Sequence, residues 1–305
     1  MPQKFKVDKD YHNSRFDRWF KAIVIELPQS LVEKIIRKNK VKVNRKKTKT
    51  SYRLQLGDIV EVYDISKFKI STRPKLIKYK PSKREMGIYD DLILEDNNNF
   101  LIINKPAGIA VQAGTKSFKN IIDVLKDTTY FENTKPFIVH RLDKETSGVL
   151  IIAKNREYAQ LFTSLFRIRK IHKTYIALTY GKVSPKIKTM EDELTNFDNG
   201  RKVVQKAISH MKVLKTSSEY SLVELNPITG RKHQLRKQLY AVGNPIYGDQ
   251  KYKFSNTNKA INKNLMLHSY QIRFMIKEKK YTYTALLPDY FKKLLKTKRL
   301  RLPNF

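Results

Sequence analysis

The sequence predicts an α+β fold, in which a small N-terminal unit precedes a larger domain built on a mixed, largely antiparallel sheet. Two observations favour this class: the larger part of the chain has neither a regular alternation of strands and helices nor a glycine-rich dinucleotide-binding fingerprint. Strand-like segments dominate it instead. They are Val149–Ala153, Tyr175–Tyr180, Lys202–Val213, Tyr220–Leu225, Tyr270–Ile276 and Lys280–Ala285.

Two helices are expected to interrupt these strands. Each is indicated by apolar residues at helical spacing. The first stripe consists of Tyr158, Leu161, Phe162, Leu165 and Phe166, and the second of Leu235, Leu239 and Val242.

The chain is strongly basic. Its 305 residues include 63 Lys and Arg against 28 Asp and Glu, a formal net charge of +35. Enrichment of lysine over the whole surface accounts for part of this excess, but basic residues also cluster in Lys34–Lys49 and Lys67–Arg84. Because a phosphate-binding face needs clustered cations, nucleic acid is the expected partner.

Composition disfavours several other classes of protein. The absence of cysteine excludes disulfides and thiolate zinc sites, and the 6 histidines form no pair at metal-ligand spacing, so a mechanism without metal or cofactor is expected. The segment Met1–Asp10 is charged, and no stretch approaches the roughly 18 apolar residues of a membrane span. We therefore expect a cytoplasmic protein that does not enter a membrane, and nothing in the sequence demands more than a monomer.

The N-terminal unit, residues 14–64, is expected to begin with two helices. The first is indicated by the spacing of Arg15, Phe16, Trp19 and Phe20. The second, Leu31–Lys38, follows from Ser30 and Glu33, which have the spacing of a capping box.

Strand-like segments complete this unit. Val41–Asn44 alternates as a strand, and the turn Leu56–Asp58 leads into a last strand, Ile59–Tyr63. A helix pair, a short strand, a basic stretch and a final turn and strand, in this order, resemble the S4 RNA-binding domain. In that family the second helix and the basic strand present cations to folded RNA, although any one exposed lysine is more often simply solvated. The resemblance implies phosphate contacts by Lys34, Arg37, Lys38, Lys40 and Lys42.

A basic linker is expected between the two units. Residues 65–87 lose apolar periodicity and carry repeated basic residues with two prolines. The second domain, residues 88–305, then begins with two strands, Leu92–Leu94 and Phe100–Ile103, around a polar turn.

One polar loop carries the strongest functional signal. His140–Gly148 precedes the apolar run Val149–Ile152, and taken alone it is an ordinary charged turn with Asp143 as a turn former. Its sequence, HRLDKETSG, however resembles the catalytic motif HRLDxxTSG of the RluA family of pseudouridine synthases. Other segments that match this family occur, in the family's order, at Asn104–Gly108, Lys173–Ala177, Pro227–Arg236, Gly243–Asp249 and Leu267–His268.

The resemblance is closest to the RluC type, which combines an S4 unit with this catalytic domain and has a loop similar to Gly108–Phe118. It implies an enzyme that isomerises specific uridines in large-subunit (23S) ribosomal RNA to pseudouridine, acting on a flipped-out base. Transfer RNA is the competing substrate, and a non-catalytic RNA-binding or ribosome-assembly protein is the competing class. A kinase is disfavoured by the lack of a DFG triplet and a glycine-rich phosphate loop, and a nuclease by the lack of a carboxylate cluster.

The implied reaction needs one carboxylate. It breaks the C1′–N1 glycosidic bond and joins C1′ to C5, and the base is retained, whereas a glycosidase needs a second carboxyl group. We expect Asp143 to act either as a nucleophile at C1′ or by promoting cleavage through a glycal. A desolvated carboxylate needs a nearby cation to stay ionised. We expect Arg236 to supply it, because Arg236 flanks the apolar stripe of its helix, and Arg231 is the alternative.

The remaining site residues rest on the resemblance. It implies that Tyr175 stacks on the flipped base and takes part in proton transfer. It also implies that Arg141 fills the space that the base leaves, unless Arg141 is another phosphate contact. His140 and Arg231 complete the expected RNA contacts. Two residues after the expected catalytic arginine the family usually has His, whereas this chain has Gln238; we expect tuning of the activity and not its loss.

Overall fold

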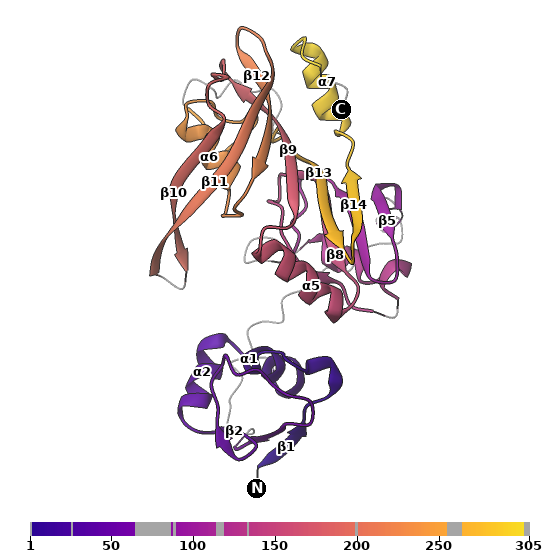
Figure 1. The fold of residues 1–305 in the computed structure, drawn as a ribbon, viewed down its shortest axis with the longest axis vertical. Coiled ribbons are helices and arrows are strands. Elements are labelled where there is room, and N and C mark those ends of the chain that lie inside the picture. The colour runs from indigo at the N-terminus through magenta and orange to yellow at the C-terminus, as the bar shows by residue number, and fades with distance from the viewer. Residues whose placement is uncertain are drawn as a thin grey trace. The chain divides into compact units, whose positions relative to one another are not determined.

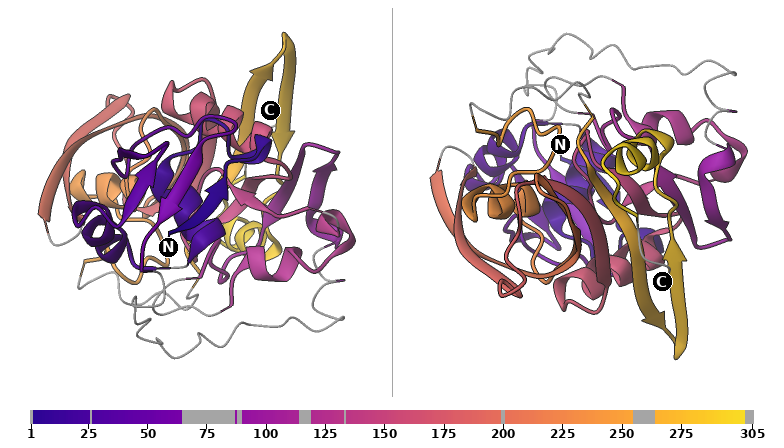
Figure 2. Two further views of the ribbon diagram at one scale, coloured as in Figure 1. Left: turned by 90° about the horizontal axis from the view of Figure 1, so that it is seen from below. Right: turned by 90° about the horizontal axis from the view of Figure 1, so that it is seen from above.

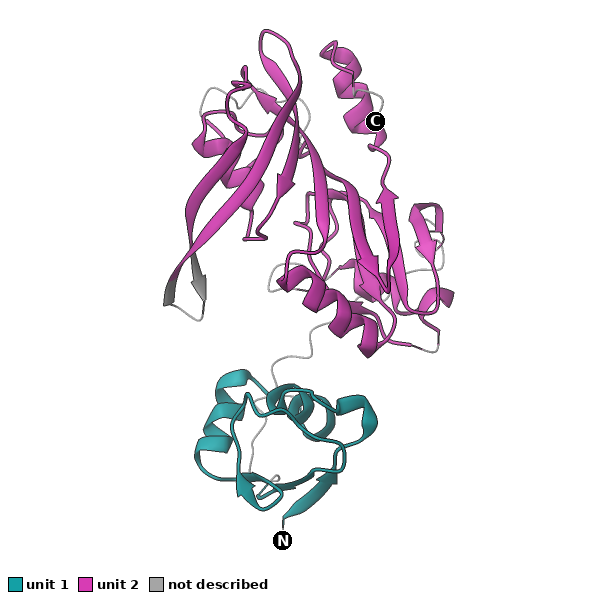
Figure 3. Ribbon diagram, in the orientation of Figure 1, with its two compact units in different colours: residues 1–76 teal, residues 77–305 magenta. Residues whose placement is uncertain are grey.

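The computed structural model divides the chain into two compact units, Met1–Leu76 and Ile77–Phe305 (Figure 3). The expected linker, residues 65–87, lies outside the described residues except for Gly87, and so does the 114–118 part of the loop expected at Gly108–Phe118. The residues that the structure describes are 2–25, 27–64, 87, 90–113, 119–132, 134–198, 201–254 and 264–301.

Unit 1 combines a four-stranded antiparallel sheet, in the order β1-β4-β2-β3, with short helices (Figure 1). Its core contains Phe16, Trp19 and Phe20, as their spacing predicts. The strands are β1 (Gln3–Lys6), β2 (Val41–Val43), β3 (Lys46–Lys47) and β4 (Ile59–Val62). The helical segments are η1 (Lys9–Tyr11), α1 (Phe16–Trp19), η2 (Phe20–Val24) and α2 (Gln29–Arg37).

The start of α2 differs from the prediction. The helix begins directly after Pro28, and no side chain caps its first turn, so the predicted capping box of Ser30 and Glu33 is wrong. Proline has no amide hydrogen to satisfy, and its ring holds φ in a range that leads into a helix, so Ser30 falls inside the first turn. Strand β1 was not expected, because Phe5 is its only apolar residue.

Unit 2 is built on a ten-stranded sheet in the order β10-β11-β12-β9-β13-β8-β6-β5, with β14 paired to β13 and β7 to β8 (Figures 1 and 2). All strand pairs of this sheet in the described residues are antiparallel except β8 with β13, which confirms the predicted mixed, largely antiparallel sheet. The strands are β5 (Ile93–Asp96), β6 (Phe100–Lys105), β7 (Phe137–Ile138), β8 (Ser147–Ala153), β9 (His172–Tyr180), β10 (Thr189–Asp198), β11 (Arg201–Thr216), β12 (Tyr220–Pro227), β13 (Leu267–Ile276) and β14 (Lys279–Thr284).

Helices cover this sheet unevenly. They are η4 (Asp90–Leu92), α4 (Ile121–Leu125), η5 (Thr129–Phe131), α5 (Arg156–Arg167), α6 (Gln234–Ala241) and α7 (Asp289–Thr297). Alternate residues of β6 and β8 enter two different clusters, one with α4 and one with α5, so every residue of β8 is buried. Helices α6 and α7 pack against β9 and β12 in a third cluster. No helix in the described part of the chain is long and apolar enough to cross a bilayer.

The two halves of the sheet meet where β8 touches β13. The paired residues are Ser147 with His268 and Gly148 with Ser269. Gly148 has a φ of 112°, and a Cβ at this position would lie 2.1 Å from the carbonyl oxygen of Ser269, so only glycine allows this approach. The buried contact is reinforced by a hydrogen bond of 2.8 Å between Ser147 Oγ and His268 Nδ1, while His268 Nε2 donates to Ala285 O at 3.0 Å.

We expect Gly148→Ala to lower the free energy of unfolding by about 3 kcal/mol or more, because the added methyl must displace β13 or strain the backbone. Urea unfolding followed by circular dichroism measures this change. Gly230→Ala is the matched control, since nothing lies within 4 Å of the place of its Cβ, and its effect should stay below about 1 kcal/mol. Equal destabilisation of both variants would show that the approach of β8 to β13 does not constrain the fold.

Candidate active site

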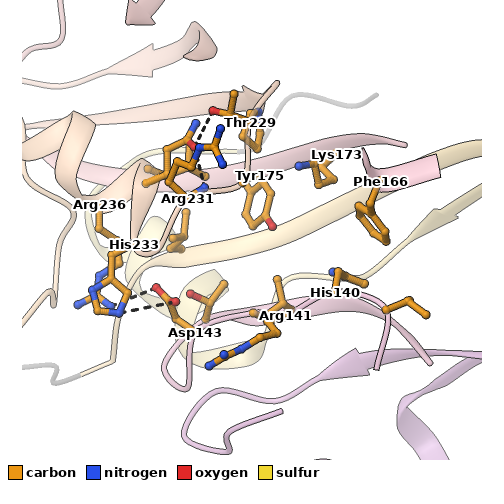
Figure 4. A pocket seen from close by; sticks show the side chains of 18 of the residues that line it. His140, Arg141, Asp143, Phe166, Lys173, Tyr175, Thr229, Arg231, His233 and Arg236 are labelled. Atoms are coloured by element: carbon orange, nitrogen blue, oxygen red, sulfur yellow. Dashed lines mark hydrogen bonds and ion pairs between the residues drawn. The ribbon is translucent and has the colours of Figure 1, made fainter. Parts of the chain in front are cut away.

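A pocket of about 780 Å³ lies in unit 2, beside the predicted catalytic loop (Figure 4). Its walls come from the loop before β8, the end of α5, the first half of β9 and the segment from the end of β12 into α6. Five of the predicted site residues line it: His140, Arg141, Asp143, Tyr175 and Arg236, and so does the alternative arginine, Arg231.

Asp143 is held at the start of β8 by a closely fixed loop. Strand β7, which is antiparallel to β8, leads into this loop. The amide of Ile151 in β8 donates to His140 Nε2 at 2.9 Å and so fixes the start of the loop. The amide of Thr146 then donates to Asp143 O at 3.1 Å, which closes the turn. The loop is also tied from behind, because the amide of Gly108 donates to Lys144 O at 2.9 Å.

A buried lysine supports the same loop. Lys105 is fully buried, and its Nζ donates to the carbonyl oxygens of Pro106 at 2.8 Å, Ile109 at 2.9 Å and Lys144 at 3.3 Å. Burial lowers the pKa of Lys105 to about 7. Lys105 belongs to the segment Asn104–Gly108, which matches the family, but the sequence gave no sign of its role, because a lysine is normally expected at the surface.

Arg236 bridges two carboxylates. Its Nη1 donates to Asp143 Oδ2 at 3.2 Å, and its Nε and Nη2 donate to both oxygens of Asp249 at 2.7 and 2.8 Å. Burial opposes the charge of Arg236, but the hydrogen bonds and the negative charge of Asp249 outweigh it and raise the arginine pKa. Asp249 also accepts from the amides of Lys251 and Tyr252 at 2.8 and 3.0 Å. Arg236 is thus fixed from behind, and one edge of its guanidinium is left for Asp143.

The alternative arginine has a different partner. Arg231 donates from Nε to Lys206 O at 3.1 Å, so of the two arginines it is Arg236 that reaches Asp143. The turn that carries Arg231 is pinned by Gln234, whose Oε1 accepts from Thr229 Oγ1 at 2.7 Å and from the amide of Arg231 at 3.0 Å.

His233 is a site residue that sequence reasoning missed. It precedes α6 in the left-handed conformation, with a φ of 54°, which costs energy for a residue other than glycine and often marks a functional site. Its Nε2 lies 3.8 Å from Asp143 Oδ1, and its Nδ1 lies 3.0 Å from the hydroxyl of Tyr252. Burial lowers the pKa of His233, and the charge of Asp143 offsets this only in part. Its position inside the segment Pro227–Arg236 was the only signal in the sequence.

Tyr175 faces the pocket from β9. It pairs across the sheet with Ser269 of β13 and with Leu225 of β12. Burial raises the pKa of Tyr175 to about 12, so the phenol is protonated at neutral pH. The hydroxyl points toward the loop that carries Arg141 and Asp143 (Figure 4).

His140 and Arg141 differ in exposure. The ring of His140 packs on Phe166 with 4.7 Å between centroids, and burial lowers the pKa of His140 to about 3, so it is a neutral part of the wall. Arg141 is exposed at the rim of the pocket.

The other five expected RNA contacts lie in unit 1. Lys34, Arg37 and Lys38 are exposed on α2 and after it. Lys40 instead forms an ion pair of 2.5 Å with Asp64, and the ammonium group of Lys42 lies 5.5 Å from the centre of the Tyr63 ring.

Gln238 does not itself line the pocket, but Ser209 Oγ connects it to Gln234, which does. It is fully buried, and its Oε1 accepts from Ser209 Oγ at 2.7 Å. Its Nε2 donates to Asp192 Oδ2 at 2.9 Å and to Met190 O at 3.1 Å. Gln238 thus joins α6 to β10 and β11, and the expectation that it tunes the activity stays a prediction. Among the described residues, no group of three or more His, Cys, Asp or Glu has the arrangement of a metal site.

Comparison with known proteins gives one consistent family. The profile of the RNA pseudouridylate synthase family matches residues 99–241. The chain is 32% identical over 305 residues to "Ribosomal large subunit pseudouridine synthase C" of Buchnera aphidicola subsp. Baizongia pistaciae, with 95% of each chain covered. It is 34% identical to the protein of the same name from Rickettsia conorii, with 93% of this chain and 97% of the relative covered.

Solved structures agree. "Human RNA Pseudouridylate Synthase Domain Containing 4" is 29% identical with a TM-score of 0.60, and the match covers 72% of this chain and 97% of the human one. "Human RNA Pseudouridylate Synthase Domain Containing 1" shares the fold at 21% identity, with a TM-score of 0.53 over 68% of this chain and 94% of that one. By its motifs, its fold and its similarity to these relatives over nearly the whole length, the chain belongs to the RNA pseudouridylate synthase family and, within it, to the RluC type.

Proposed function

We propose that the protein isomerises specific uridines of large-subunit (23S) ribosomal RNA to pseudouridine. The observation that carries the proposal is the pair of Asp143 and Arg236 in a pocket where Asp143 is the one carboxylate among the lining residues. Support for the substrate comes from the relatives named as ribosomal large subunit synthases, which match over nearly their whole length. Transfer RNA remains the competing substrate.

Asp143 is the proposed catalytic carboxylate. Its Oδ2 accepts a hydrogen bond from Arg236 Nη1 at 3.2 Å, and the carboxylate either attacks C1′ or promotes cleavage through a glycal. No second carboxylate is needed, because the uracil stays in the pocket and rejoins C1′ through C5. Arg236 keeps its own charge because Asp249 compensates for its burial.

Tyr175 is the proposed platform for the flipped base. Its ring faces the pocket next to Asp143, and its protonated phenol is a hydrogen-bond donor at neutral pH. Extrusion of a stacked uridine costs a few kcal/mol. We assign Arg141 to the vacated space in the RNA, since of the two exposed cations in the loop that carries Asp143, Arg141 and Lys144, it is Arg141 that lines the pocket.

Unit 1 is proposed to be an S4-like RNA-binding domain, joined by a linker to the catalytic domain. The exposed cations of α2 support this role best, and Lys40 and Lys42 contribute after release from their present partners. We propose that one chain, acting as a cytoplasmic monomer without a cofactor, grips the RNA with both units.

The proposed reaction depends on the charge of the Asp143 side chain. Wild-type protein incubated with large-subunit rRNA should produce carbodiimide-dependent stops in primer extension, whereas Asp143→Asn should reduce product formation by at least about 10³-fold with RNA affinity retained. Glu145→Gln is the matched control, because it removes the same charge from an exposed position of the same loop and should leave activity near wild type. Pseudouridine formation by Asp143→Asn would overturn the assignment. Stops on tRNA but not on rRNA would show that tRNA is the substrate and would overturn the proposal of rRNA.

The second prediction concerns the support of Arg236. Asp249→Asn keeps an acceptor for the amides of Lys251 and Tyr252 but removes the charge that orients the guanidinium. We expect kcat to fall by about 10²-fold with KM for RNA little changed. Asp289→Asn, at the exposed start of α7, is the control and should have no effect. A wild-type kcat for Asp249→Asn would show that Asp249 does not position Arg236.

The third prediction concerns unit 1. Replacement of Lys34, Arg37 and Lys38 together by Gln should make the salt dependence of RNA binding shallower by about 2 in log–log slope, roughly 0.7 for each phosphate that is no longer neutralised. At saturating RNA, kcat should be unchanged. The control replaces Lys292, Lys293 and Lys296, three exposed cations of α7, by Gln. The same reduction of slope in both triple variants would mean that α2 makes no special interaction with RNA.

A further inference from the structure

Lys173 is a half-buried cation without a counter-charge. Alternate residues of a strand share a face, so Lys173 lies on the pocket side of β9 together with Tyr175, and both line the pocket (Figure 4). Burial alone lowers the pKa of Lys173 to about 8, with no carboxylate to oppose this effect. Within the described part of the chain its ammonium group has neither a hydrogen bond nor an ion pair.

Lys105 shows what a structural buried lysine looks like in this protein. Its ammonium group donates to three carbonyl oxygens, which replace the lost water. Lys173 has no such set of acceptors, and since no side-chain nitrogen or oxygen of the described residues is both buried and without a partner, its ammonium group reaches the open pocket. The described part of the fold supplies no acceptor for Lys173, and a ligand in the pocket can supply one.

The surroundings of Lys173 select an anion. The pocket is lined by five cations and a single carboxylate, Asp143, which is already paired with Arg236. The five cations are Arg141, Arg167, Lys173, Arg231 and Arg236. His140, on the same wall, is neutral because burial lowers its pKa to about 3, so it neither adds charge nor neutralises Lys173. In RNA the group that fits an ammonium under these conditions is a backbone phosphate.

The position of Lys173 relates this phosphate to the reacting nucleotide. Lys173 precedes Tyr175 by two residues in β9, so the backbones of the two residues lie about 7 Å apart. In Figure 4 Tyr175 lies between Asp143 and the pocket end where Phe166 and Lys173 lie. Arg167, which follows Phe166 in α5, lines the same pocket.

We propose that Lys173 binds a backbone phosphate of the RNA strand that carries the target uridine, with Arg167 as a second, more exposed contact. This assignment rests on the proposed function and adds a phosphate subsite to it. Lys173 holds the nucleotide in the pocket and takes no part in bond breaking.

Three measurements on Lys173→Met, whose side chain has similar length and no charge, test the subsite. We expect the melting temperature to equal or exceed that of wild type, because an uncompensated charge is removed. Affinity for a large-subunit rRNA transcript should fall on the order of tenfold, and the salt slope should become shallower by about 1. In turnover, KM should rise while kcat at saturating RNA stays within about twofold. Lys173→Arg should restore affinity, and Lys182→Met, at an exposed position after β9, should behave as wild type.

Neutral phosphates locate the contact. RNA fragments that carry one methylphosphonate at each position around the mapped uridine should show one position where wild type loses affinity and Lys173→Met loses nothing further. A uniform loss of affinity in both proteins, or a fall in kcat with KM and salt slope unchanged, would overturn the subsite. Binding is measured without turnover, so absence of pseudouridine with wild type would count against the proposed function alone. A lowered melting temperature of Lys173→Met would show that Lys173 is structural and also overturn the proposal.

Discussion

One row of backbone pairs sets the geometry of the site. It runs from Gly148 of β8 through Ser269 of β13 to Tyr175 of β9 and Leu225 of β12. The parallel contact at its first step exists because Gly148 has no side chain to collide with β13. Through this row the loop before β8, which carries Asp143, faces the strand that carries Tyr175, and the chain beyond Leu225 continues into the turn and helix that carry Arg236.

Arg236 lies between two carboxylates, Asp249 and Asp143, which differ in how many hydrogen bonds they accept. Asp249 is almost wholly buried, and it accepts two hydrogen bonds from Arg236 and two from backbone amides, so its charge is fully used within the protein. Asp143 receives a single hydrogen bond from Arg236 and stays more exposed. The hydrogen bonds to Asp249 hold Arg236 in a fixed orientation. Because Asp143 accepts only one hydrogen bond from Arg236, its carboxylate can still accept others from the substrate.

The sequence predicted those parts of the fold that a local pattern specifies. The continuous apolar run of β8 and the stripes of α5 and α6 reflect burial directly, and the motif around Asp143 indicated the site. Strand β10 was missed because it contains three consecutive acidic residues, Glu191–Glu193, and acidic residues have low strand propensity. His233 could not be assigned a role, since its contact with Asp143 joins segments far apart in the chain. Asp249 could not be assigned one either, since its contact with Arg236 depends on how the chain folds back after α6. The error at Ser30 arose because two local signals competed and Pro28 prevailed.

Gln238 lies two residues after Arg236 on the same helix, and its amide group uses both its acceptor and its donors on β10 and β11. An imidazole at this position has at most one donor and one acceptor when neutral, and it cannot serve Ser209, Asp192 and Met190 together. The residues at positions 192, 209 and 238 therefore form an interdependent set, in which exchange of one favours exchange of the others. The way in which the β10–β11 hairpin packs on the helix that carries the arginine therefore depends on these three residues together.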